Sequence, residues 1–214
     1  DRDENDNLVV SKDAVAAYVA ELASKYDTAG TERTFSTYDN RDITVSGGNY
    51  GWVIDQQKEA DALYKDITEK KTEVREPVYE QKASSRKIND IGYSYIEIDL
   101  SAQRMVLYQS GSPVVDTGLV ADSSTPTGIY ALGEKESSAV PGGGAGETVN
   151  FWMPFTDKTG IYGKAGLDVT GYDFSDDADI AAFGSDDESS GTSGFSDSWP
   201  GIEGCIAVPE EQAQ

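Results

Sequence analysis

Toward its C-terminal end the chain reads Ile202-Glu203-Gly204-Cys205-Ile206-Ala207-Val208-Pro209, and this stretch contains the single cysteine of the sequence. A small apolar run bounded by glycine and proline predicts a short strand, with the thiol at the turn that precedes it. A lone cysteine is commonly a buried and inert side chain. It acts as a nucleophile where a base, a polarising group and some exposure lie beside it. The rest of the sequence has to decide between these two interpretations.

Charge and composition exclude several functions. The 214 residues carry a formal charge of −22, and residues 165–214 contain twelve acidic side chains and no basic one. Nucleic-acid binding needs a basic surface, so we expect no nucleic-acid partner. The chain has no histidine, which is the usual base near neutral pH and the commonest transition-metal ligand. The acidic segment 168–200 also lacks the ligand spacing of an EF-hand, so we expect no metal site and no cofactor.

The hydrophobic periodicity changes near residue 90. Residues 11–26 and 55–70 repeat apolar side chains at helical spacing, and Ser11 and Asp55 are suitable N-caps. Short strand-like runs lie among them, including one over residues 73–79. From Gly92 onward, short alternating runs joined by tight turns predict a sandwich or barrel. We therefore predict an α+β domain over residues 1–88 and a mainly-β domain over residues 92–214.

A set of short motifs carries a resemblance to a known family. In chain order they are Ile98-Asp99-Leu100, Gln103-Arg104-Met105, Thr125-Pro126-Thr127-Gly128, Trp152-Met153-Pro154-Phe155 and Gly204-Cys205-Ile206. In this order the motifs resemble the L,D-transpeptidase (YkuD) family of bacterial cell-wall enzymes. The first part of the chain, through Tyr50-Gly51-Trp52 and Asn89-Asp90-Ile91-Gly92, resembles the peptidoglycan-binding domain that precedes the catalytic domain in Gram-positive members.

The resemblance implies a β-sandwich catalytic domain and a set of roles. Cys205 would be the nucleophile that attacks a peptidoglycan stem peptide, expels the terminal D-alanine and passes the acyl group to an amine. Gly204 would lie in the oxyanion-hole region, and Trp152 and Met153 would line the substrate groove. The partners would then be peptidoglycan stem peptides, and the protein would be extracellular and associated with the cell wall. No apolar run is long enough to cross a bilayer.

The sequence departs from the family pattern at both histidines. Glu203 stands at the family histidine position next to the catalytic Gly-Cys pair. The second position is open: the distance from the Trp152 motif points to Tyr162, and the local pattern points to Ser175, which we prefer slightly. The resemblance also implies that the chain stops before the last helix and strand of the family.

Three functional hypotheses remain. The first is an L,D-transpeptidase-type cysteine acyltransferase, although the lack of histidine and the adjacent Glu203 argue against full turnover. The second is a catalytically inactive relative that binds wall peptides. The third is an acidic β-domain with a structural role. Because a nucleophile needs access to its substrate, we expect Cys205 at the floor of a groove if the first hypothesis is correct, and inside the sandwich core if it is not.

Overall fold

The computed structural model describes residue 4 and residues 9–87, 89–121, 123–143, 146–169 and 202–214. The chain divides into two compact units, of which the first comprises Asp1–Thr34 and Thr44–Gly92 and the second Phe35–Ile43 and Tyr93–Gln214. The predicted fold class, a small helix-containing unit followed by a mainly-β one, is confirmed. No helix in the described residues combines the length and the apolar character that crossing a membrane requires.

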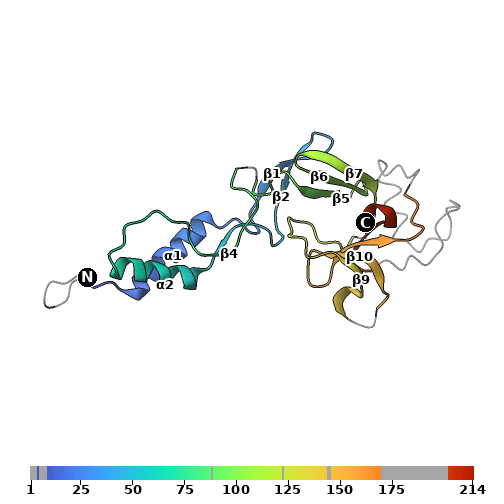
Figure 1. Cartoon of the computed structure of the whole chain (residues 1–214). Coiled ribbons are helices and arrows are strands. Elements are labelled where there is room, and N and C mark those ends of the chain that lie inside the picture. Colours follow the sequence, from blue (N-terminus) through green and yellow to red (C-terminus); the bar gives the residue numbers. More distant parts are fainter. Residues whose placement is uncertain (1–3, 5–8, 88, 122, 144–145, 170–201) are drawn as a thin grey trace. The chain divides into compact units, whose positions relative to one another are not determined.

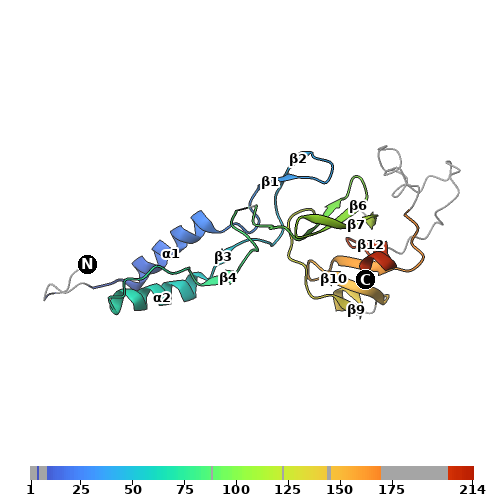
Figure 2. The same ribbon diagram turned by 45° about the horizontal axis from the view of Figure 1, so that its top comes forward.

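The first unit is organised around two helices, α1 (Lys12–Tyr26) and α2 (Gln56–Thr68), which lie side by side in Figures 1 and 2. Both predicted N-caps are present, because the Ser11 side chain accepts a hydrogen bond from the Ala14 N–H at 3.2 Å and Asp55 accepts one from the Lys58 N–H at 3.0 Å. The helices bury a small apolar core that consists of Val15, Val19, Ala23, Ile54 and Ala60.

Short strands complete this part of the chain. They are β1 (Arg33–Ser36), β2 (Asp42–Val45), β3 (Val53–Ile54) and β4 (Tyr79–Gln81), paired as β1 with β2 and β3 with β4. The strand predicted over residues 73–79 was placed too early, since β4 begins only at Tyr79. Pro77 lacks the N–H that a sheet ladder requires, and the chain pairs only after it.

Apart from the β1–β2 hairpin, the described residues of the second unit form two sheets. Three antiparallel strands, β5 (Tyr95–Asp99), β6 (Arg104–Gln109) and β7 (Ser112–Gly118), form the smaller sheet. The larger sheet has the order β8-β12-β11-β10-β9. Its strands are β8 (Val120–Ala121), β9 (Glu136–Ala139), β10 (Val149–Pro154), β11 (Gly160–Lys164) and β12 (Ile206–Pro209). The described residues also form a 3-10 turn, Pro141–Gly143, and a short helix α4, Glu210–Ala213.

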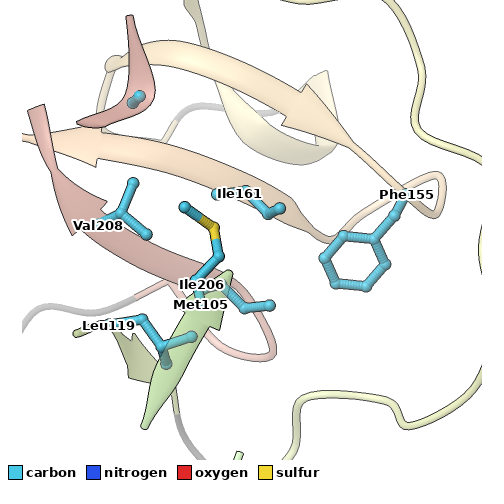
Figure 3. Close-up of a cluster of buried hydrophobic side chains, with 7 residues drawn as sticks. Met105, Leu119, Phe155, Ile161, Ile206 and Val208 are labelled. Carbon is cyan, nitrogen blue, oxygen red and sulfur yellow. The ribbon is translucent and has the colours of Figure 1, made fainter. Parts of the chain in front are cut away.

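The main hydrophobic core lies between the two sheets. Ile161, Ile206 and Val208 of the larger sheet point toward Met105 of the smaller one and toward Leu119, as Figure 3 shows. Partly buried side chains from β5 and β7 pack against the same cluster. Two sheets that share one apolar core form a sandwich, as the sequence predicted.

One strand pair explains a long connection in the sequence. β11 and β12 run parallel, with Ile161 opposite Ile206 and Tyr162 opposite Ala207. Neighbouring parallel strands cannot be joined by a tight turn, because the chain must cross back over the sheet before it can run in the same direction. Residues 165–205 connect the two strands in the sequence. Most of the acidic segment 168–200 lies outside the described residues.

A hairpin that comes early in the chain belongs to the second unit. Its residues Phe35–Ile43 are held by β5, since the Tyr38 N–H donates to Glu97 Oε1 at 2.8 Å and Arg41 pairs with Asp99 at 2.7 Å. The Arg104 guanidinium also lies 4.5 Å from the centroid of the Tyr38 ring. A single boundary between residues 88 and 92 therefore does not separate the two units, because the segment Phe35–Ile43 lies before it and belongs to the second unit.

Candidate functional site

Cys205 lies at the turn that leads into β12, as expected from the sequence. The Cys205 N–H donates to the Ile202 carbonyl at 2.9 Å and closes a four-residue turn. Gly204, at the third position of this turn, has φ +73°, which a type II turn requires and which glycine adopts without strain. A side chain at residue 204 would also approach Thr159 Cγ2 to 3.0 Å. The Gly-Cys pair is thus fixed both by backbone conformation and by close packing.

The thiol lies on the face of the larger sheet that is turned away from the sandwich core. Successive side chains of β12 alternate, so Ile206 and Val208 enter the core while Cys205 and Ala207 take the other side. On this outer face Cys205 joins a second apolar cluster with Val149, Trp152 and Tyr162. The residue is 4% exposed. It is therefore a covered thiol on a sheet surface and not part of the main core.

Tyr162 is the ionisable side chain of this cluster besides the thiol. Burial raises the pKa of Tyr162 to about 12, and the negative form of the nearby Cys205 thiol adds to this rise. A hydrogen bond from the Ile202 backbone works in the opposite direction. Near neutral pH the side chain is therefore an uncharged phenol. It can donate a hydrogen bond beside Cys205, but it cannot take the place of an imidazole base.

The thiol itself has a backbone acceptor. Cys205 Sγ donates to the Lys158 carbonyl at 3.8 Å. Lys158 lies in the β10–β11 turn, which a hydrogen bond of 2.6 Å between the hydroxyls of Thr156 and Thr159 holds together. A carbonyl can only accept, so the thiol is the donor in this contact. Sequence analysis did not single out this turn, because a backbone carbonyl looks the same whatever residue carries it.

Trp152 is placed beside the thiol by a bulge in β10. The pairing of β10 with β11 shifts register between Asn150 and Met153, and Phe151 has φ +53°, which is rare for a bulky residue. A Cβ on Gly160 would come within 2.6 Å of the Trp152 ring, so the glycine provides the space for the indole. Such bulges occur often beside active sites, where they redirect a side chain.

The other residues predicted for the site, as far as the structure describes them, do not join the cluster that contains Cys205. Met153 packs against the sandwich core, because it follows Trp152 directly and neighbouring strand residues point to opposite faces. Glu203 is exposed at the second position of the turn. Ser175 lies outside the described residues, so of the two alternatives for the second histidine position the structure describes Tyr162 alone. In the described part of the chain, no group of three acidic or cysteine side chains is arranged to hold a metal ion.

Comparisons with known proteins agree with this architecture. A family model for the L,D-transpeptidase catalytic domain matches residues 93–214, and a model for a proposed peptidoglycan-binding domain matches residues 5–75. No curated protein sequence matches the chain significantly.

Two solved structures have a similar fold. One is the avibactam carbamoyl enzyme of Ldtfm, which is 24% identical, with a TM-score of 0.64 over 100% of this chain and 78% of that chain. Another is a cysteine-to-serine mutant of an Enterococcus faecium L,D-transpeptidase, also 24% identical, with a TM-score of 0.64 over 99% of this chain and 79% of that one. The catalytic-domain model covers more than half of the sequence, and its region coincides with the sandwich that carries Cys205. The chain therefore belongs to the L,D-transpeptidase family.

Proposed function

We propose that the protein is an L,D-transpeptidase-type cysteine acyltransferase that acts on peptidoglycan stem peptides during cell-wall cross-linking, with Cys205 as its nucleophile. The observation that carries this proposal is the position of Cys205. The thiol lies at the start of β12 on the outer face of the larger sheet, beside Tyr162 and Trp152 and apart from the sandwich core. Because the substrate is wall peptide, the protein would act outside the cell membrane, in association with the wall.

The proposed reaction has two acyl transfers. The Cys205 thiol loses its proton, and its sulfur attacks a carbonyl of the donor stem, so that a C–S bond forms and the carbonyl oxygen becomes an oxyanion. When the carbonyl is restored, the bond to the terminal D-alanine breaks, and the amine of the departing D-alanine takes up the proton that the thiol lost. The amine of a second stem then attacks the thioester, forms the new amide and returns the proton to sulfur. In this proposal Tyr162 donates a hydrogen bond to the oxyanion, and Gly204 lies in the oxyanion-hole region, as the family resemblance implies.

The first test is covalent capture of the thiol. Incubation with a carbapenem, and separately with avibactam, should add one acyl or carbamoyl group to the protein, and intact-mass spectrometry detects it. The variant Cys205→Ser should remain unmodified, which locates the adduct. A wild-type protein that stays unmodified after prolonged incubation at pH 9, where thiols ionise, contradicts the proposal.

The second test restores the family residues. The double variant Tyr162→His/Glu203→His removes the charge next to the cysteine and supplies an imidazole that titrates near neutrality. We expect acylation at pH 7 to become faster by roughly 10²-fold, the lower end of what proton transfer contributes in enzymes. The pH dependence of Cys205 alkylation checks the same change independently. The variant Tyr162→Phe/Glu203→Gln is the matched control, since it alters the same residues without adding a base.

The alternative alignment is tested in the same way. Ser175→His/Glu203→His should be the faster double variant if Ser175 takes the second histidine position. If both double variants are folded and react no faster than wild type, the outer face around Cys205 is not catalytic.

A second candidate function is wall binding without turnover. The thiol donates to the Lys158 carbonyl, and the neighbouring Tyr162 is an uncharged phenol near neutral pH, so neither of these two groups takes the proton from the thiol. Sedimentation with purified peptidoglycan tests this candidate. A protein that pellets with the polymer but forms no adduct at Cys205 supports binding alone.

A further inference from the structure

A cluster of aromatic and basic side chains lies in the first unit, remote in sequence from Cys205. Its members are Trp52, Tyr79, Lys82 and Arg86, here called the Arg86 cluster. The Arg86 guanidinium lies 4.1 Å from the centroid of the Trp52 ring and donates to the Tyr79 hydroxyl at 2.7 Å. The Lys82 ammonium is 5.4 Å from the centroid of Tyr79. Both cations therefore lie against the Tyr79 ring, and Arg86 lies against the Trp52 ring as well.

The two rings of the Arg86 cluster, those of Trp52 and Tyr79, are held in place by packing and hydrogen bonds. The two rings meet edge to face, with their centroids 5.0 Å apart. The Trp52 indole N–H donates to the Ser85 carbonyl at 3.0 Å, and the Trp52 backbone N–H donates to the Thr28 hydroxyl at 2.9 Å. Tyr79 packs against the core between the helices. A guanidinium that packs on these rings therefore loses little further conformational entropy when it binds a ligand.

The positive charge of the Arg86 cluster is poorly compensated, although the chain as a whole is strongly acidic. The other arginines in the described residues each pair with a carboxylate, and these are Arg33, Arg41, Arg75 and Arg104. Arg86 contacts aromatic rings and a hydroxyl instead.

The acidic side chains next to the cluster do not neutralise Arg86. Residues 81–89 contain three basic side chains and no acidic one. The neighbouring Glu80 points to the other face of β4, where it acts on Lys58. Lys82 has one carboxylate partner, Glu76, at 3.8 Å, and both of these side chains are largely exposed.

We propose that the Arg86 cluster binds an oxyanion of the cell-wall polymer. A guanidinium that packs on an indole directs its N–H groups outward from its edge, and those that do not donate to the Tyr79 hydroxyl can bind a carboxylate or phosphate with two hydrogen bonds. An anion there would also relieve the repulsion between Arg86 and Lys82. Stem-peptide carboxylates and wall-linked phosphates share this chemistry. The proposal rests on the proposed function only for the identity of the polymer, not for any step at Cys205.

The experiment is co-sedimentation of the whole protein with purified cell walls at low ionic strength. Arg86→Gln should weaken binding by roughly 10- to 100-fold, the range for losing a charge-assisted hydrogen bond. Arg86→Lys keeps the charge and much of the packing on Trp52 but loses the planar fork, and it should fall between Arg86→Gln and wild type. Lys65→Gln removes the same charge from an exposed position of α2 and should bind like wild type. Circular dichroism must show that each variant is folded.

Two treatments of the wall distinguish the source of the anion. Amidation of the wall carboxylates abolishes the difference between wild type and Arg86→Gln if the ligand is a stem carboxylate. Removal of phosphate polymers with hydrofluoric acid abolishes it if the ligand is a phosphate. The proposal is overturned if wild type does not bind walls, or if folded Arg86→Gln and Arg86→Lys both bind as tightly as wild type.

Failure of this proposal is separable from failure of the proposed function. Adduct formation at Cys205 with a carbapenem, which is a small soluble reagent, should be the same in wild type and Arg86→Gln. Loss of wall binding with an unchanged adduct therefore concerns the Arg86 cluster alone.

Discussion

At the scale of single residues, the neighbour of the cysteine determines what chemistry is available. The phenol of Tyr162 remains protonated at neutral pH because burial disfavours its charged form. An imidazole in the same place would be able to accept a proton. On the outer face of the larger sheet, the side chain of Tyr162 is thus a hydrogen-bond donor in the same cluster as the Cys205 thiol.

The raised pKa of Tyr162 predicts a specific loss of stability in alkali. A free tyrosine titrates near pH 10 and the folded side chain near 12, so both states are protonated below pH 10 and this residue adds no pH dependence there. Between about pH 10 and 12 the unfolded chain loses its proton first, and the free energy of unfolding falls by about 2–3 kcal/mol. Tyr162→Phe should lack this part of the decrease, which urea unfolding at pH 9 and pH 11.5 would measure.

Tyr18→Phe provides the control for that measurement. Tyr18 is 52% exposed on α1, so its removal should leave the alkaline decrease as it is in wild type. Equal pH dependence in Tyr162→Phe and Tyr18→Phe would show that the Tyr162 phenol is not desolvated.

At the scale of elements, the sequence predicted the helices and their caps better than it predicted which side chains and carbonyls lie around the thiol. Ser11 and Asp55 cap their helices as predicted, since a cap depends on neighbours three residues away. The distribution of Trp152 and Met153 to opposite faces follows from strand alternation, yet the resemblance had placed both in one groove. The contact of the thiol with the Lys158 carbonyl could not be predicted, because it depends on how a turn packs and not on a residue type.

Gly160 makes the arrangement of these elements testable. A Cβ at this position would lie 2.6 Å from both the Trp152 ring and the Met153 carbonyl, so Gly160→Ala has to displace backbone or indole. We expect it to lower the free energy of unfolding by about 1–3 kcal/mol, as overpacking commonly does. Chemical denaturation measures the change. Gly146→Ala is the control, because among the described residues its Cβ would meet Val140 alone, at 3.5 Å. Equal stability of the two variants would contradict the close packing at Gly160.

At the scale of the whole molecule, net charge is the dominant feature. A charge of −22 on 214 residues opposes compaction by self-repulsion, which dissolved salt screens. The melting temperature at pH 7 should therefore rise between about 0.01 M and 1 M NaCl, as the screening length falls from about 30 Å to 3 Å. Calorimetry at pH 4, close to the isoelectric point of 4.1, is the control and should show a much smaller rise. A rise of equal size at both pH values would mean that salt acts other than by screening.

The hairpin Phe35–Ile43 limits how recombination can exchange the N-terminal part of such a protein during evolution. Its backbone and side chains hold Glu97 and Asp99 of β5, although more than fifty residues of chain separate them. A single crossover near residue 92 would join the sandwich to the N-terminal segment of another protein. The resulting chimera would lack the original hairpin. The Glu97 carboxylate, which is 8% exposed, would then lose its backbone donor. Lineages that exchange their N-terminal modules would have to carry the hairpin along, so the two units are expected to descend together.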